Sequence, residues 1–156
     1  MESNKNYHYF FKYVFLGAGF ILLKTSFVSW FFPQLIRMNG EQLSQDLFVT
    51  VVFGLIGFAM ILIFLTIKDK FVMARLGSQT VTLKKSDWEL KTNWMDVESI
   101  SLIQFVYPPL YKIKVKGSEE TYWFNTESQF MKFGGVINDL SEMGDLVKKK
   151  KRELGI

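Results

Sequence analysis

The segment from Leu47 to Ile67 restricts what this chain folds into more than any other feature of its sequence. It reads LFVTVVFGLIGFAMILIFLTI and carries no charged side chain. At a rise of about 1.5 Å per residue, a helix of this length is about 30 Å long, which matches the hydrocarbon thickness of a bilayer. A buried helix of a soluble protein is the alternative, but a chain of 156 residues is too small to enclose it on all sides. We therefore predict a transmembrane helix.

A second apolar segment lies nearer the N-terminus, from about Tyr9 to Ile36. A cleaved signal peptide fits poorly, because no small-residue cleavage site is evident and the other apolar segment follows at once. Aromatic rings gather at both ends, as is typical of helices whose ends lie at the headgroup level. These rings are Tyr7, Tyr9 and Tyr13 at one end and Trp30, Phe31 and Phe32 at the other.

The connection between the two segments, Arg37 to Asp46, is short and polar and contains the turn dipeptide Asn39-Gly40. The helices are therefore expected to form an antiparallel hairpin. Only Arg37 supplies a positive charge to the connection, whereas basic residues are frequent on the opposite flanks, which places both termini in the cytoplasm. We predict a multi-pass protein of the cell inner (cytoplasmic) membrane. The flanking basic residues are Lys5, Lys12, Lys68, Lys70, Arg75, Lys84 and Lys85.

Small residues at helical spacing predict that the two helices pack on each other. Gly17 and Ala18 lie on one side of the first helix, and Gly54 and Gly57 lie on one side of the second. Small side chains let two backbones approach closely, which favours helix association in lipid. The alternative is that glycine is simply common in membrane helices.

Lys24 falls near the centre of the first apolar segment. A central lysine costs on the order of 2.5–3.5 kcal/mol on insertion scales, and the second segment offers no acidic partner. Three interpretations remain open at this stage. Lys24 extends toward the membrane surface, pairs with a group of another subunit, or lines an ion path in an oligomer.

After Ile67 the apolar residues alternate with polar ones, which indicates short antiparallel strands. Whether residues 71–76 form a strand or continue the membrane helix is left open. A single C-terminal helix is expected from the spacing of Phe130, Phe133, Ile137, Leu140 and Val147, capped by Asn125 or Thr126 and kinked at Gly134-Gly135. The expected strands are 79–84, 88–91, one that follows Trp94 and ends near Val106, 111–116 and 121–125.

The hairpin TVTLKKSDWELK, the following NWMDVESI, the strand YKIKVK and the closing helix resemble the bacterial pleckstrin-homology-like (PH-like) domain. The resemblance covers roughly Phe71 to Glu153. It implies a bent, partly open antiparallel barrel or sandwich capped by the C-terminal helix, and a module that binds diverse partners. The expected protein is thus of the α+β class, with a transmembrane hairpin over 1–67 and a cytoplasmic PH-like domain over 68–156.

Composition excludes several kinds of chemistry. The chain has no cysteine and one histidine, His8, which argues against disulfides, zinc sites and a Ser-His-Asp triad in the domain. Asp96 and Glu98 stand two apart on an expected strand and would share a face, but a solvated strand face explains them better than a metal or acid–base pair. We therefore predict no catalytic residues, no metal and no cofactor.

Basic residues supply the candidate binding surface. In YKIKVK every second residue shares a face, so Ile113 and Val115 would point to the core and the lysines between them would project as one row. Lysines that guard an edge strand, or that suit the end of a helix, are the alternatives. The candidates for contact with anionic headgroups are Lys112, Lys114, Lys116, Lys84 and Lys91, with Lys148, Lys149, Lys150, Lys151 and Arg152 on the helix.

These observations predict a non-enzymatic, membrane-anchored adaptor that presents the PH-like module for protein or lipid binding. The net charge of +4 favours anionic lipid over nucleic acid, for which we expect no binding. The alternative is a small accessory subunit of a larger transport, secretion or motility complex, or a homo-oligomer, in which Lys24 makes an intramembrane contact.

Overall fold

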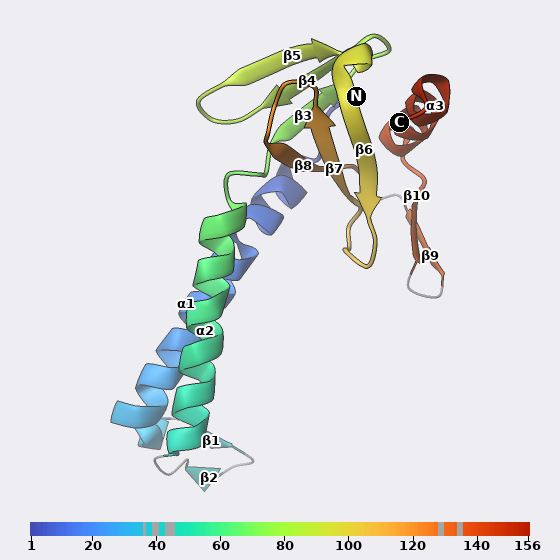
Figure 1. Cartoon of the computed structure of the whole chain (residues 1–156). Coiled ribbons are helices and arrows are strands. Elements are labelled where there is room, and N and C mark those ends of the chain that lie inside the picture. The colour runs from blue at the N-terminus through green and yellow to red at the C-terminus, as the bar shows by residue number, and fades with distance from the viewer. Residues whose placement is uncertain (36, 39–40, 43–45, 128–129, 134–135) are drawn as a thin grey trace. The chain divides into compact units, whose positions relative to one another are not determined.

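A computed structural model describes the backbone of residues 1–35, 37–38, 41–42, 46–127, 130–133 and 136–156, and the side chains outside 36–45 and 128–136. Figure 1 shows two helices followed by a β domain and a C-terminal helix. The chain divides into two compact units. One is formed by Phe11–Lys68, and the other joins Met1–Phe10 to Asp69–Ile156.

Helix α1 comprises Lys5–Phe31, so it begins and ends earlier than the expected segment of 9–36. Its first turn is capped by the side-chain oxygen of Asn4, which accepts hydrogen bonds from the backbone N–H groups of Asn6 and Tyr7 at 3.0 and 3.2 Å. The helix ends before Pro33 because proline disfavours the helical conformation of the residue that precedes it. Pro33–Leu35 instead forms a short 3-10 helix, η1, and Ile36 lies outside the described residues.

Helix α2 comprises Leu47–Ile67, the same residues that were expected from the sequence. Asp46 caps it by accepting hydrogen bonds from two backbone N–H groups of the first turn. Strands β1 (Arg37–Met38) and β2 (Glu41–Gln42) pair in an antiparallel manner within the connection, while the expected turn at Asn39-Gly40 lies outside the described residues. Both α1 and α2 are long and apolar enough to cross a membrane.

Two three-stranded antiparallel sheets form the body of the β domain, in the orders β3-β4-β5 and β6-β7-β8. Residues 71–76 therefore lead into a strand and do not continue α2. The expected strands are present, although the one that follows Trp94 ends at Ile103 and not near Val106. The strands are β3 (Met73–Leu76), β4 (Thr80–Lys84), β5 (Glu89–Asn93), β6 (Val97–Ile103), β7 (Leu110–Val115) and β8 (Thr121–Asn125), with the 3-10 helix η2 (Trp94–Asp96) before β6.

The C-terminal region corrects the expectation of one long helix. Residues Phe130–Phe133 and Val136–Asp139 are strands β9 and β10, which pair with each other, and α3 comprises only Glu142–Leu154. Phe133 of β9 pairs with Val136 of β10 at one end of this antiparallel pair. The expected kink at Gly134-Gly135 lies outside the described residues. The helix cap is Ser141, not Asn125 or Thr126.

The two sheets meet where the chain leaves α2. Phe71 forms a parallel bridge to Trp123 of β8, and the rings of the two residues lie edge to face with centroids 5.5 Å apart. Trp123 N donates to Lys70 O at 2.7 Å, and Val72 N donates to Trp123 O at 2.9 Å. Within the described residues the strands do not close into a barrel. Two apolar helices, two antiparallel sheets and a C-terminal helix are compatible with a PH-like fold.

The core lies between the two sheets and α3. Leu83 of β4 and Ile113 of β7 are fully buried, and Met143 and Val147 bring α3 into the same cluster. Trp94 is 3% exposed, and its indole nitrogen donates to Gly77 O at 2.8 Å. This tryptophan therefore fastens η2 to the turn that follows β3.

Candidate functional site

Strand β7 is the central strand of its sheet, which positions the expected row of lysines. Ile113 and Val115 are buried, as the alternation predicted, and Lys112 and Lys114 lie on the opposite, outer face. Because β7 pairs with β6 on one side and β8 on the other, the alternative of lysines that guard a sheet edge is wrong. The outer face of a central strand is a surface on which side chains from three strands meet.

The three lysines of the row have different surroundings. Lys114 Nζ lies 2.9 Å from a carboxylate oxygen of Glu98, and Lys116 Nζ donates to Met95 O at 2.8 Å. Lys112 is exposed, lies opposite Ser101 and Trp123 in the sheet, and has no hydrogen bond or ion pair in the described part of the chain. Lys112 therefore differs from the other two lysines, because its ammonium group meets neither a carboxylate nor a backbone carbonyl among the described residues.

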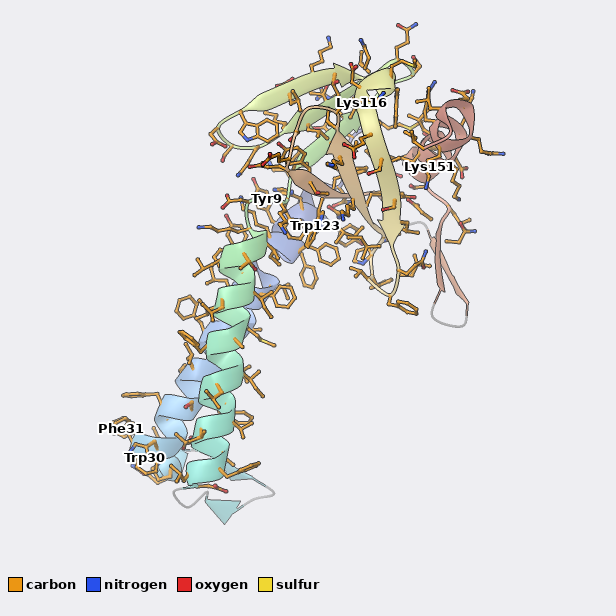
Figure 2. The ribbon with its side chains drawn as sticks, in the orientation of Figure 1. Tyr9, Trp30, Phe31, Lys116, Trp123 and Lys151 are labelled. Carbon is orange, nitrogen blue, oxygen red and sulfur yellow. The ribbon has the colours of Figure 1, made fainter. Side chains whose placement is uncertain are left out.

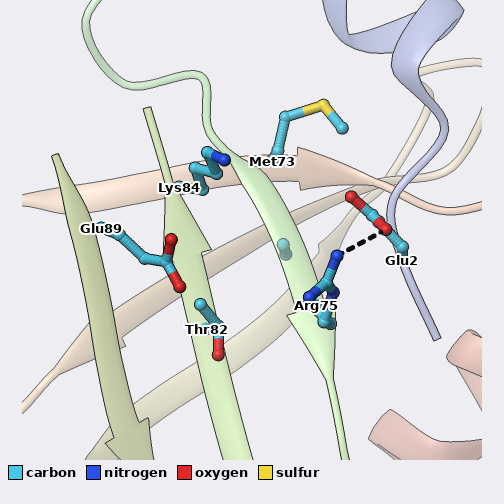
Figure 3. A pocket seen from close by; sticks show the side chains of 7 residues that line it. Glu2, Met73, Arg75, Thr82, Lys84 and Glu89 are labelled. Carbon is cyan, nitrogen blue, oxygen red and sulfur yellow. Dashed lines mark hydrogen bonds and ion pairs between the residues drawn. The ribbon is translucent and has the colours of Figure 1, made fainter. Parts of the chain in front are cut away.

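Lys84 and Lys91 do not extend this row, because they lie on the other sheet. They share the outer face of β3-β4-β5 with Arg75, as the register pairs Arg75–Thr82, Thr82–Lys91 and Lys84–Glu89 show. A shallow pocket of about 70 Å³ opens on this face (Figure 3). Its lining carries both charge signs, and is made by Glu2, Met73, Ala74, Arg75, Thr82, Lys84 and Glu89.

The basic run of α3 is largely paired within its own helix. Lys150 Nζ lies 2.7 Å from Glu153, and Lys149 lies 4.0 Å from the same carboxyl group. The hydrogen bond from Lys150 is the main reason why the pKa of Glu153 is lowered. Lys148 lies 3.3 Å from Asp145, and Arg152 Nε donates to Lys148 O at 3.3 Å. Lys151 stands in the last turn, where a cation suits the helix dipole (Figure 2).

The N-terminal residues form an extra piece of sheet that sequence reasoning missed. Ser3 N donates to Ala74 O at 2.8 Å, Ala74 N donates to Ser3 Oγ at 2.9 Å, and Leu76 N donates to Met1 O at 2.9 Å. Between them, Glu2 pairs with Arg75 at 3.1 Å, the contact marked in Figure 3. The edge of β3 is thus covered by the chain itself. Three residues before an apolar helix, one apolar and two polar, carry no signal for such a distant pairing.

A buried carboxylate joins the C-terminal helix to the sheets. Asp139 is fully buried; its carboxylate accepts from Thr126 Oγ1 at 2.7 Å and from Ser141 N at 2.9 Å, and its backbone carbonyl accepts from Lys148 Nζ. Gly144 lies so close that an added Cβ would meet the carboxylate at 2.5 Å. Burial, then the nearby charge of Asp139, raises the pKa of Tyr111. We interpret this cluster as structural, because its polar groups already bond to one another and connect α3 to β10 and to the end of β8.

The two acidic residues before β7 do not form a pair. Asp96 lies in η2 and accepts from Thr92 Oγ1 at 3.3 Å, whereas Glu98 lies in β6 beside a register shift and pairs with Lys114. The expectation that both would face one way was wrong, because Asp96 is not in a strand. In the described residues, no group of three or more His, Asp or Glu side chains could hold a metal ion.

In the helical hairpin, the face of α1 that contacts α2 differs from the expected face at Gly17 and Ala18. Gly57 touches α1: a Cβ added there would lie 2.9 Å from Gly19 O and 3.0 Å from Leu23. Gly54 faces Ser26, while a Cβ at Gly17 would meet open space. The close approach therefore centres on Gly19, not on Gly17, and Ala18 is only half-buried.

Two hydroxyl contacts add to the hairpin. Ser26 Oγ donates to Thr50 O at 2.7 Å, and the hydroxyls of Ser29 and Thr50 lie 3.0 Å apart. Lys24, by contrast, is exposed on α1, and no ion pair or hydrogen bond of its side chain occurs within the described residues. Among the described residues, the Lys24 charge therefore has no carboxylate beside it.

Comparisons of the chain with family models, with curated proteins and with solved structures each gave no match. The arrangement of residues is therefore what supports a function. It provides an exposed cation on the central strand of one sheet, a mixed-charge pocket on the other, and short connections to two apolar helices.

Proposed function

We propose that this chain is a non-enzymatic, membrane-anchored adaptor whose PH-like domain binds protein or anionic lipid at the cytoplasmic face. The observation that carries the proposal is the shortness of the connections between the helices and the β domain. Only Asn4 stands between Ser3, which pairs with β3, and the start of α1. Only Lys68 and Asp69 separate the end of α2 from Lys70, which pairs with β8.

These connections are also held at their domain ends. Asp69 lies 2.9 Å from Lys85 Nζ, and this hydrogen bond is the main reason why the pKa of Lys85 is raised. Lys70 Nζ stands 5.4 Å from the centre of the Trp123 ring. A domain on two short connections meets a membrane surface at high effective concentration, so weak contacts are enough to orient it. Each basic residue near an anionic leaflet adds about 1 kcal/mol.

The proposed orientation puts both termini in the cytoplasm of a bacterial cell, as the distribution of basic residues favours. A reporter fused after Ile156 is expected to be active only on the cytoplasmic side. A cysteine introduced at Asn39 is expected to react with an impermeant reagent from outside, and the chain supplies no cysteine of its own to confuse the result. Reaction at Asn39 only after the inner membrane is permeabilised would reverse this orientation.

The binding surface is tested in the full chain, reconstituted in vesicles. A fluorophore on a cysteine at Glu119, in the turn between β7 and β8, reports its distance from a dye in the lipid by energy transfer. Transfer should be stronger in vesicles that contain phosphatidylglycerol than in neutral ones, and added salt should remove the difference. The variant Lys112→Gln should reduce the difference more than Lys149→Gln, which alters a cation already close to Glu153. Equal transfer in both lipids would argue against lipid binding.

The outward position of Lys24 favours a second candidate function, that of an accessory subunit in a larger membrane complex. A carboxylate of another subunit would neutralise the charge, and loss of one partner of a buried pair costs roughly 3–5 kcal/mol. Lys24→Leu should then insert normally but lose that subunit in co-purification from native membranes at equal expression. Thr25→Val, on the next position of α1, serves as the control. Equal recovery of all partners with Lys24→Leu would remove this candidate.

A further inference from the structure

The loop between β6 and β7, residues 104–109, presents an aromatic side chain to solvent. Phe105 is 78% exposed, more than any other large apolar side chain in the part of the chain that the structure describes. Its backbone has a φ of +66°, and it is the one described non-glycine residue with a positive φ. This left-handed conformation is unfavourable for a residue with a Cβ. The fold therefore holds the ring outward against a local preference.

The base of the loop is fixed on both sides. Ile103 and Leu110 pair across the hairpin, and Pro108 and Pro109 are buried. Gln104 Oε1 accepts a hydrogen bond from Ile137 N of β10 at 3.1 Å, and Pro109 O accepts one from Thr126 N at 3.4 Å. Backbone and side-chain contacts on both sides of the loop therefore hold Phe105 in its exposed position.

We propose that this loop inserts Phe105 and Tyr107 into the headgroup–acyl boundary of the bilayer that α1 and α2 cross, as a third membrane contact. The inference rests on the proposed membrane-anchored function. Tyr107 is 59% exposed and combines an apolar ring with a polar hydroxyl. Aromatic side chains of this kind prefer the boundary between water and hydrocarbon. The contact would determine which face of the domain meets the leaflet.

The exposed apolar area of this loop is small, which suits a bilayer better than a protein partner. A stable protein–protein interface buries about 800 Å² on each partner. Within the loop itself, Pro108 and Pro109 are buried, Gln104 is polar and Val106 is only partly exposed, so the two rings supply most of the exposed apolar surface of residues 104–109. Two rings are enough for a membrane contact when the domain is already tethered by two short connections, since the contact is then intramolecular.

The experiment uses the full chain in vesicles of neutral phosphatidylcholine, where the basic surface contributes little. A single cysteine at Tyr107 carries an environment-sensitive dye, which is site-specific because the chain has no cysteine. We expect blue-shifted emission that nitroxide on the lipid chains quenches and aqueous iodide does not. Phe105→Ser should reduce the lipid quenching severalfold, and Phe105→Trp should retain it. Met95→Ser, which removes a side chain 68% exposed elsewhere on the domain, should leave it unchanged.

Two results would overturn the inference. One is iodide quenching at position 107 equal to that of the same dye on a cysteine at Ser118, in the β7–β8 turn. The other is loss of the lipid quenching when the protein is diluted into excess lipid, which would identify a second copy as the occupant. The proposed binding function is tested separately. It would be contradicted if energy transfer from position 119 were equal in neutral and anionic vesicles and if no protein partner co-purified with the chain. Failure of the loop insertion and failure of the proposed binding function are therefore distinguishable.

Discussion

The helical hairpin and the β domain differ in how far apart in the sequence their stabilising partners lie. In α2, backbone groups pair within the helix, and the cap Asp46 is adjacent to it. In the β domain, Ser3 pairs with Ala74, and Phe71 pairs with Trp123. A helix in lipid satisfies its own backbone, whereas a sheet needs partners from elsewhere in the chain. Local sequence therefore specifies the first region and only suggests the second.

The two regions also differ in how they use small and polar residues. The hairpin brings Gly19 and Gly57 into close contact near the middle of both helices, and Ser26 and Thr50 add a hydrogen bond nearer the connection between them. The β domain instead buries Asp139, the last residue of β10, between Thr126 and the start of α3. Close packing tolerates little added volume, and a buried carboxylate tolerates little loss of its partners. We therefore expect the hairpin to be destabilised by larger side chains at its contact, and the β domain by removal of a buried polar partner.

The largest effect is expected from Asp139→Ala. Removal of this carboxylate leaves the buried Thr126 hydroxyl and Ser141 N–H without their acceptor, which should lower the free energy of unfolding of the β domain by about 3 kcal/mol. Denaturant titration in detergent, followed by tryptophan fluorescence, measures the change. Asp145→Ala is the control, because its side chain is 70% exposed and should change stability by less than about 0.5 kcal/mol. Equal effects would show that the buried cluster is not the fastening of α3.

A smaller loss of stability, confined to the helical hairpin, is expected from Gly57→Leu. The added side chain would collide with Gly19 O and Leu23, which should weaken the helix contact by about 1–3 kcal/mol. Cysteines at Ser29 and Thr50, whose hydroxyls lie 3.0 Å apart, should then form a disulfide severalfold more slowly. Gly17→Leu faces open space and should leave the rate unchanged. If Gly57→Leu alone also unfolds the β domain, the two regions are not independent.

Alkaline pH provides a third comparison within the β domain. Because the pKa of Tyr111 is raised in the folded state, the folded protein keeps the phenol proton above about pH 10, where the unfolded chain loses it. The free energy of unfolding should therefore fall as the pH rises above 10, by up to about 1.4 kcal/mol per pH unit from this group. Tyr111→Phe should show a shallower fall between pH 10 and 11.5 in the same denaturant titrations. If the free energy of unfolding fell equally with pH in the wild type and in Tyr111→Phe, burial would not be suppressing the ionisation of Tyr111.

The smallest effect is expected in the loop between β6 and β7. Phe105→Gly relieves the positive φ and should raise the free energy of unfolding by roughly 0.5–1 kcal/mol, since glycine adopts this conformation readily. Phe105→Ala removes the ring but retains a Cβ, and should bring no such increase. Thermal unfolding in detergent distinguishes the two variants. A gain with alanine equal to that with glycine would show that the ring, not the backbone, is unfavourable in solution.

Several features of the fold could be read directly from short stretches of sequence. The uncharged run Leu47–Ile67 is a helix over the same residues, and the alternation in YKIKVK placed Ile113 and Val115 in the core. The turn Lys85-Ser86-Asp87 lies in the hairpin of β4 and β5. Periodicity predicted these elements because each depends on neighbours in the chain. The charges of the candidate surface were likewise visible as residue types.

The same reasoning failed where a pattern allowed two structures. The spacing of Phe130, Phe133 and Ile137 suits a helix, yet these residues lie in paired strands, and the helix begins only after its cap at Ser141. Lys84 and Lys91 looked like additions to the row on β7, but they lie on the second sheet. Short apolar runs do not distinguish strand from helix without their packing partners.

The sequence alone therefore determined the two apolar helices, the alternating strands and the excess of positive charge, since each is a property of consecutive residues. Only the tertiary structure decided that β7 is a central strand, that Met1–Ser3 covers the edge of β3 and that Asp139 is buried beneath α3. It also decided that Phe105, one of many phenylalanines, is held outward by its backbone. These outcomes depend on contacts between residues far apart in the chain, and a local pattern carries no information about which distant segments meet.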